Sequence, residues 1–236
     1  MTDPSAGLDL SIPRTNGQVF AVAFRIYSHW AHLFIFLGAI VLVPYGVVTA
    51  IVTSAKHVST ATELVLALAG IAIVNPFIAA MQMQALIDLG AQRRPMLADV
   101  LRRGLRVLPV VAAAGIVAGL PEFLGLIYPP FVIPGLLAAV RLVVAAPVAA
   151  AEGGTWPDAV RRSVRLTRGN SWRVFGLLLI QAILTLVVAS LVGTSAISAT
   201  IVGVALAVLA QSFFTLVIAL LYFDLRAREA GPVLSE

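Results

Sequence analysis

Long apolar stretches recur along almost the whole chain, and this pattern constrains the fold more than any other feature. A helix that crosses the hydrocarbon core of a bilayer needs about 20 consecutive, mostly apolar residues. Six stretches meet this demand, at residues 31–53, 64–87, 105–127, 131–151, 174–192 and 197–223. Only 11% of the residues are charged, against about a quarter in soluble domains. The sequence therefore predicts an all-α integral membrane protein with six transmembrane helices.

The basic residues indicate the orientation of these spans. Of the 16 Lys and Arg residues, all but Lys56 and Arg141 lie in the terminal segments, in the loops after the second and fourth spans or, for Arg106, at the very start of the third span. Cytoplasmic loops retain Lys and Arg during insertion, so both termini are predicted to face the cytoplasm. Residues 1–30 carry Asp3 and Asp9 and lack the basic start of a signal peptide, so the first span is expected to stay. We expect one membrane domain, residues 15–229, between a flexible N-terminal tail, 1–14, and a C-terminal tail, 230–236.

A short basic segment is repeated along the chain. Residues 99–107 align with residues 158–166 at a constant offset of 59. Residues 18–26 have the same spacing of apolar residues, and Arg25 corresponds to the last Arg of the other two segments. Apolar residues at helical spacing with Arg between them predict an amphipathic helix at the headgroup boundary. Thr15-x-x-Gln18 and Thr155-x-x-Asp158 are typical helix starts. The period predicts three units, about 15–94, 95–154 and 155–229, in a pseudo-threefold bundle with three interfacial helices.

An acid follows each second span of these units. Asp88, Glu152 and Asp224 stand at helix carboxyl ends, where the helix dipole is unfavourable for negative charge. Nearby Arg residues are therefore expected to pair with them. The expected pairs are Asp88 with Arg93 or Arg94, Glu152 with Arg161 or Arg162, and Asp224 with Arg226 or Arg228.

The remaining cytoplasmic Arg residues are candidates for binding a negatively charged partner. An Arg near a membrane surface gains about 1 kcal/mol from anionic lipid. The candidates for binding lipid headgroups or a partner protein are Arg102, Arg103, Arg106, Arg161, Arg162, Arg165 and Arg168. Nucleic acid is not an expected partner, because every Arg cluster lies directly beside a span.

The sequence contains no pattern typical of a catalytic site. It lacks nucleophile elbows, phosphate-binding loops and two-His metal helices, and it has no Cys. His29 and His32 flank Trp30, where an interfacial aromatic belt is expected. We therefore expect neither a metal nor a cofactor, and no enzymatic activity.

Arg141 lies inside the fourth predicted span and suggests an alternative function. A cation at that depth costs about 2.5 to 3.5 kcal/mol, so it should have a partner. Arg141 either neutralises an anionic ligand in a polar cavity lined by Asn75, Gln181 and Gln211, or it reaches the interface or Glu152. A small-molecule transporter or permease-like protein with a cavity around Arg141 therefore remains open. The Gly115-x-x-x-Gly119 pattern fits either close packing inside the bundle or dimerisation.

Several segments resemble a known family. They are the opening residues 18–27, Ile133-Pro134-Gly135 with Arg141-Leu142 and Pro147, the segment 152–173, and the exit 222–228. Together they resemble the bacterial membrane domain family named after glycerophosphoryl diester phosphodiesterase, and its related uncharacterised multi-pass proteins. The resemblance implies a multi-span module of the bacterial plasma membrane. It implies no catalytic residues, because the phosphodiesterase activity in the family's name requires a separate soluble barrel domain, for which this chain is too short.

These observations combine into one functional prediction. We expect a non-catalytic multi-pass protein of the plasma membrane whose Arg-rich cytoplasmic rim binds anionic lipid headgroups or docks a partner protein. The transporter around Arg141 is the alternative.

Overall fold

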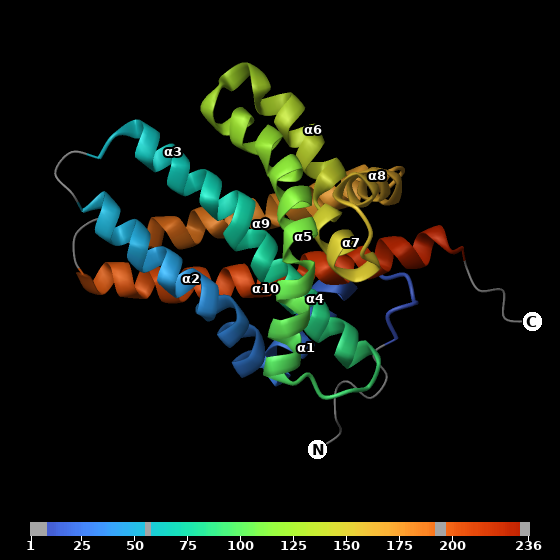
Figure 1. The fold of residues 1–236 in the computed structure, drawn as a ribbon. Coiled ribbons are helices and arrows are strands. Elements are labelled where there is room, and N and C mark those ends of the chain that lie inside the picture. Colours follow the sequence, from blue (N-terminus) through green and yellow to red (C-terminus); the bar gives the residue numbers. More distant parts are fainter. Residues whose placement is uncertain (1–8, 55–57, 192–196, 232–236) are drawn as a thin grey trace, which may run out of the picture.

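The computed structural model describes residues 9–54, 58–191 and 197–231. Within these ranges the protein is all-helical and contains no strand, with 86% of the chain in helices (Figure 1). The all-α class is thus confirmed. The outer parts of the two predicted tails, residues 1–8 and 232–236, lie outside the described residues, as does Lys56.

Four apolar helical segments in the described chain are long enough to cross a membrane. They are α2 (Ala31–Thr53), α5 (Leu97–Ile127), the stretch Pro129–Glu152, which contains α6 (Val132–Leu142) and α7 (Ala145–Glu152), and α10 (Ile197–Glu229). A fifth is possible if α8 (Trp156–Thr167) and α9 (Ser171–Leu191) count as one span, but the chain bends by 104° between them. The structure therefore supports four to five spans, and the predicted count of six is not confirmed.

The second predicted span, 64–87, consists of three consecutive helical pieces. They are α3 (Thr60–Ala69), the π-helical turn η1 (Gly70–Val74) and α4 (Asn75–Gly90). Pro76 has no backbone N–H, so the regular α-helical hydrogen-bond pattern cannot continue through it. The N–H of Asn75 instead donates to the Gly70 carbonyl, five residues earlier. Neither α3 nor α4 alone reaches the length of a span.

Separate short helices form in two of the three places where interfacial helices were predicted. α1 (Asn16–His29) begins with a complete capping box, in which the Thr15 and Gln18 side chains satisfy each other's backbone N–H groups, and it ends before Trp30. α8 is likewise separate from the helix that follows it. The predicted side-chain cap at Thr155 does not form, because its hydroxyl donates to the Asp158 carboxylate instead, at 2.5 Å.

The separate middle amphipathic helix is a wrong prediction, because residues 97–127 form one continuous helix, α5. Gly169, with φ of +84°, lets the chain turn after α8, whereas α5 contains no residue with positive φ. The glycine of the middle segment, Gly104, instead allows α5 to approach α4 closely. A Cβ atom there would lie 2.9 Å from Cγ of Met81.

The core lies where α4 and α10 pack against α2, α5 and α7 (Figure 1). The largest fully buried side chains come mainly from α4 and α10 and are Tyr222, Phe34, Leu37, Ile78, Met81, Met83, Leu86, Leu89, Leu216, Leu220, Leu221 and Leu225. Gly115 and Gly119 of α5 face Pro76 and Ile71, and Cβ atoms there would lie 2.3 Å and 2.0 Å from those side chains. Packing inside the bundle therefore accounts for this glycine pair.

Candidate functional site: a basic cleft and the ion pairs of the rim

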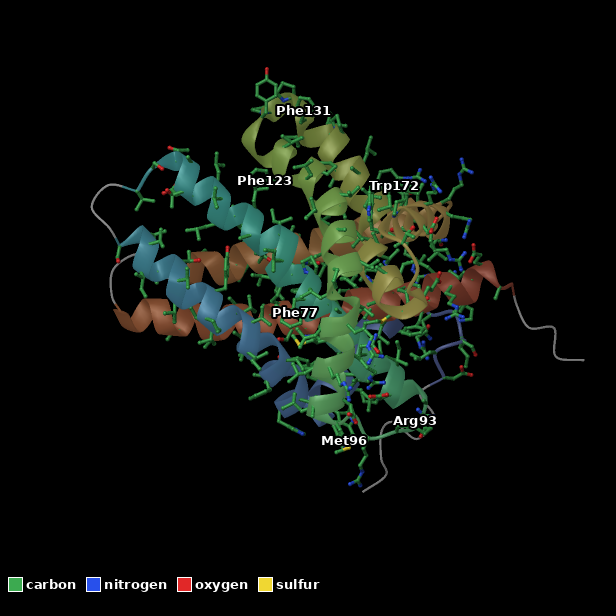
Figure 2. All side chains as sticks on the ribbon, in the orientation of Figure 1. Phe77, Arg93, Met96, Phe123, Phe131 and Trp172 are labelled. Carbon is green, nitrogen blue, oxygen red and sulfur yellow. The ribbon has the colours of Figure 1, made fainter. Side chains whose placement is uncertain are left out.

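The loop between α4 and α5 forms one wall of a basic cleft. α4 ends at Gly90, the left-handed Gln92 (φ 57°) turns the chain, and α5 begins at Leu97. The cleft has a volume of about 450 Å³. Its lining residues are Asp88, Arg93, Arg94, Met96, Asp99, Arg102, Arg103 and Arg106. Figure 2 shows Arg93 and Met96 at the same end of the molecule, on this loop.

The charges of the cleft do not balance. Five Arg residues face two acids, which leaves a net charge of +3. Arg103 donates to both carboxylate oxygens of buried Asp88, with an Nη1–Oδ1 distance of 2.9 Å, and its Nε donates to the Asp99 carbonyl. The other four Arg residues are exposed and form no ion pair with any residue that the structure describes. They are Arg93, Arg94, Arg102 and Arg106.

The sequence predicted that Asp88 pairs with Arg93 or Arg94, and this prediction is wrong. Arg103 lies on the α5 face that packs on α4, next to Gly104, and from there its planar guanidinium meets the carboxylate with two hydrogen bonds. The loop arginines are exposed instead. Sequence reasoning treated Arg93 and Arg94 as structural partners and missed them as site residues. Their position between a helix end and Pro95 was the available signal.

The Arg residues of α8 are engaged in a different way. Arg162 pairs with Glu152 of α7 at 3.3 Å and with Glu229 of α10 at 2.5 Å, and Arg165 also pairs with Glu229 at 3.3 Å. The Tyr222 hydroxyl donates to Glu152 at 2.9 Å. Burial lowers the pKa of Arg162, but hydrogen bonds and charges from Glu229 and Glu152 outweigh burial and raise it above its usual value. Arg162 therefore links the middle of α8 to the ends of α7 and α10.

Two further candidates on α8 and just after it are more exposed. Arg161 lies 3.6 Å from Asp158, and both side chains are largely exposed to solvent. Arg168, after the end of α8, is exposed and forms no ion pair within the described chain. The predicted headgroup residues thus divide by pairing. The three Arg residues of α8 and Arg103 have carboxylate partners, whereas Arg102 and Arg106 in the cleft and Arg168 after α8 form no ion pair with a described residue.

Asp224 is the most buried acid of the rim, with 0% of its surface exposed. Its carboxylate accepts from Arg173 of α9 at 3.1 Å and from Arg228 of α10 at 3.2 Å. The backbone N–H of Arg14 also donates to it. The pairing with Arg228 falls within the expected set, whereas Arg173 and the Arg14 backbone were not anticipated.

The structure brings together three of the four polar residues that the sequence predicts inside the membrane and leaves out the fourth. Asn75, Gln181 and Gln211 line a second cavity, and Gln211 Nε2 donates to Asn75 Oδ1 at 3.2 Å. Arg141 is half-buried but does not line this cavity, and it forms no ion pair with a described residue. Glu152, its proposed partner, binds Arg162 instead.

Arg141 has a backbone role that sequence reasoning missed. The helix is interrupted after Leu142, and α7 begins at Ala145. The carbonyl of Arg141 accepts hydrogen bonds from Ser163 at 2.9 Å and from Thr167 at 3.3 Å, two hydroxyls one turn apart on α8. α8 therefore stabilises the break in the preceding helix.

The chemistry of the basic cleft suits the binding of an anion. Guanidinium groups donate to phosphate or carboxylate oxygens, often in pairs. Among the described residues, no group of three His, Asp or Glu side chains could hold a metal ion. Comparisons of the chain with protein-family models, curated proteins and solved structures found no match.

Proposed function

We propose that this protein is a non-catalytic, multi-pass protein of the bacterial plasma membrane that binds anionic lipid headgroups on its cytoplasmic face. The observation that carries the proposal is the basic cleft, where four exposed Arg residues without acidic partners surround one cavity of about 450 Å³. We assign headgroup binding mainly to this cleft rather than to the whole rim, because the Arg residues of α8 already have carboxylate partners.

Apolar side chains beside the cleft support a lipid rather than a soluble anion. Met96 is 66% exposed within the cleft, and Leu105 is 55% exposed between Arg102 and Arg106. Exposed apolar residues next to guanidinium groups are typical of a headgroup boundary, where chains enter the acyl region and cations meet phosphates. The cleft also lies at the start of α5, one of the helices long enough to span a membrane.

Our proposal includes six spans with cytoplasmic termini, arranged as three units. The unbroken succession of α3, η1 and α4 supports a sixth crossing. Of the three acids that follow a second span, the first two contact the beginning of the next unit, and Asp224 contacts the residue directly before the first unit, which supports a cyclic arrangement. These contacts join Asp88 to Arg103, Glu152 to Arg162, and Asp224 to the Arg14 backbone.

The native chain has no Cys, so single cysteine variants test this topology directly. Arg94→Cys and Arg161→Cys should react with a membrane-impermeant maleimide only from the cytoplasmic side of inverted vesicles. Ser59→Cys, at the start of α3, should react only from the other side. Labelling of positions 94 and 161 from opposite sides would contradict the proposed orientation.

The function is tested by comparing two double variants with the same change in charge. Arg102→Gln/Arg106→Gln removes two unpaired cations of the cleft, and Arg161→Gln/Arg165→Gln removes their counterparts on α8. Native mass spectrometry would measure phosphatidylglycerol binding, with phosphatidylcholine, whose headgroup has no net charge, as the control. Two surface cations contribute about 2 kcal/mol, so the cleft variant should bind roughly 30-fold more weakly. The α8 variant should change roughly threefold or less, because those Arg residues already have carboxylate partners.

Two outcomes would contradict the assignment to the cleft. One is an equal loss in both double variants, which would indicate a diffuse effect of charge over the whole rim. The other is unchanged phosphatidylglycerol binding in the cleft variant.

A further inference from the structure

A second cavity lies among the apolar helices, separate from the basic cleft. It has a volume of about 980 Å³ and is bounded by η1, α4, α5, α6, α7, α9 and α10. Along α9 it extends from Phe175 to Leu186, which corresponds to about 16 Å at the rise of an α-helix. The volume is at the upper end of the roughly 300 to 1,000 Å³ typical of small-molecule sites.

The wall of this cavity is apolar and uncharged. None of the lining residues in the described chain is Asp, Glu, Lys, Arg or His. Its polar groups are five neutral side chains from three helices, namely Asn75, Gln181, Thr185, Gln211 and Thr215. A charged group placed here would have no counter-ion among these residues, so the cavity favours an uncharged occupant.

The amide groups in the cavity have unused hydrogen-bonding capacity. The bond from Gln211 to Asn75 uses one N–H and one acceptor site of the pair. The Thr215 hydroxyl donates to the Gln211 carbonyl at 2.8 Å. Within the described part of the chain, the side-chain N–H groups of Asn75 and the whole amide of Gln181 have no protein partner. In an apolar environment such groups gain by donating to a ligand.

The backbone holds the Asn75 amide at the cavity wall. The π-helical turn η1 ends directly before Asn75, and such turns occur often at functional sites. Pro76 packs so closely on Gly115 that a Cβ atom there would lie 2.3 Å from Pro76 Cγ. This contact fixes the first turn of α4 against α5, and with it the position from which the amide reaches a ligand.

We infer that this cavity binds an uncharged lipid-like molecule, with an apolar chain along α9 and a carbonyl group that accepts hydrogen bonds from Asn75 and Gln181. An ester-linked acyl chain without a charged headgroup has this chemistry. The inference stands independently of the basic cleft, because the two cavities share no lining residue.

The test uses the full chain in mild detergent and a diacylglycerol that carries a diazirine midway along one acyl chain. Photo-adducts mapped by mass spectrometry should fall on cavity residues of α9 and α10 that are partly buried, such as Phe175, Leu178 and Ile218. Ala182→Phe, which places a bulky ring in the cavity, should reduce these adducts about tenfold, a change equivalent to about 1.4 kcal/mol. Asn75→Leu should reduce them several-fold, because one hydrogen bond is lost.

A matched variant controls for nonspecific labelling. Ala207 is an exposed Ala of α10 that does not line the cavity, so Ala207→Phe should leave the adducts unchanged. The Arg102→Gln/Arg106→Gln variant should also leave them unchanged, which separates a failure of this inference from a failure of the proposed headgroup site. Adducts confined to outward positions such as Val202 and Leu209, or equal labelling of the Ala182→Phe protein, would overturn the inference. Stronger labelling by a phosphatidic acid with the same diazirine chain would do so too.

Discussion

Two segments with the same spacing of charges, 99–106 in α5 and 158–165 in α8, behave differently in the folded protein. Each begins with Asp and carries three Arg residues at equivalent positions. The middle Arg does the same thing in both, because Arg103 binds Asp88 and Arg162 binds Glu152, the acid at the end of the preceding apolar helix. The last Arg differs, since Arg165 pairs with Glu229 whereas Arg106 has no described partner.

The difference comes from the neighbouring helix and not from the segment itself. The end of α10 lies beside α8 and places Glu229 between Arg162 and Arg165. No carboxylate in the described residues occupies the equivalent place beside α5. The last Arg of such a basic segment is therefore paired or left without an ion pair according to whether an acid from a helix distant in the sequence reaches it.

The largest expected effect on stability comes from breaking a buried ion pair rather than an exposed one. Asp224→Ala removes a fully buried carboxylate and leaves Arg173 without its acid, so it should lower the free energy of unfolding by about 3 kcal/mol. Asp158→Ala breaks an exposed pair with Arg161 and an exposed hydrogen bond from Thr155, and it should cost about 1 kcal/mol or less. Denaturation by SDS in mixed micelles measures both. Similar costs for the two variants would show that burial does not distinguish these pairs.

A second prediction concerns the residue that makes the two segments pack differently, and it gives α8 the glycine found at the equivalent position of α5. Gly104 and Ser163 occupy equivalent positions, and Ser163 donates to the Arg141 carbonyl while Gly104 admits Met81. Ser163→Gly loses that hydrogen bond and adds a glycine inside α8, so it should cost about 2 kcal/mol. Ser163→Ala loses only the bond and should cost about 1 kcal/mol. The same unfolding measurement checks both, and equal stability of Ser163→Gly and the wild type would refute the capping role.

Some features could be predicted because they depend on neighbours in the sequence. The first span was predicted at residues 31–53, and α2 has those bounds, because an apolar stretch of that length specifies a helix by itself. The capping box at Thr15 and Gln18 likewise depends only on a spacing of three residues.

Other features depend on how helices face one another, which one sequence does not show. The pairing of Asp88 with Arg103 requires the rotation of α5 against α4, and the role of Glu229 requires α10 to lie beside α8. Arg141 illustrates the same limit. Its neighbours Leu142 and Val143 line the large cavity, whereas the Arg141 side chain does not. Successive side chains on an α-helix point in directions about 100° apart, so a residue next to a lining residue can face away from the cavity.

A third prediction concerns a variant in which the Arg residues of α8 lose a carboxylate partner and so become more like those of α5. Glu229→Gln removes the shared carboxylate and should free Arg165 completely and Arg162 in part. One additional free cation near the surface contributes about 1 kcal/mol, so phosphatidylglycerol binding should rise about fivefold. Native mass spectrometry measures the change. The gain should disappear in Glu229→Gln/Arg165→Gln, and its persistence would show that it arises elsewhere.

The smallest expected effect comes from the reverse change, in which an acid is added to the open segment. Met96 is exposed within the cleft, so Met96→Glu adds to the unpaired Arg residues a carboxylate like the one that Glu229 supplies to α8. Because the new pair is exposed, phosphatidylglycerol binding should fall only roughly threefold. Met96→Gln has nearly the same shape without the charge and should retain at least half of the binding. If the Gln variant loses as much as the Glu variant, the methionine contributes by its apolar contact with lipid chains, and the difference between the two segments is not one of charge alone.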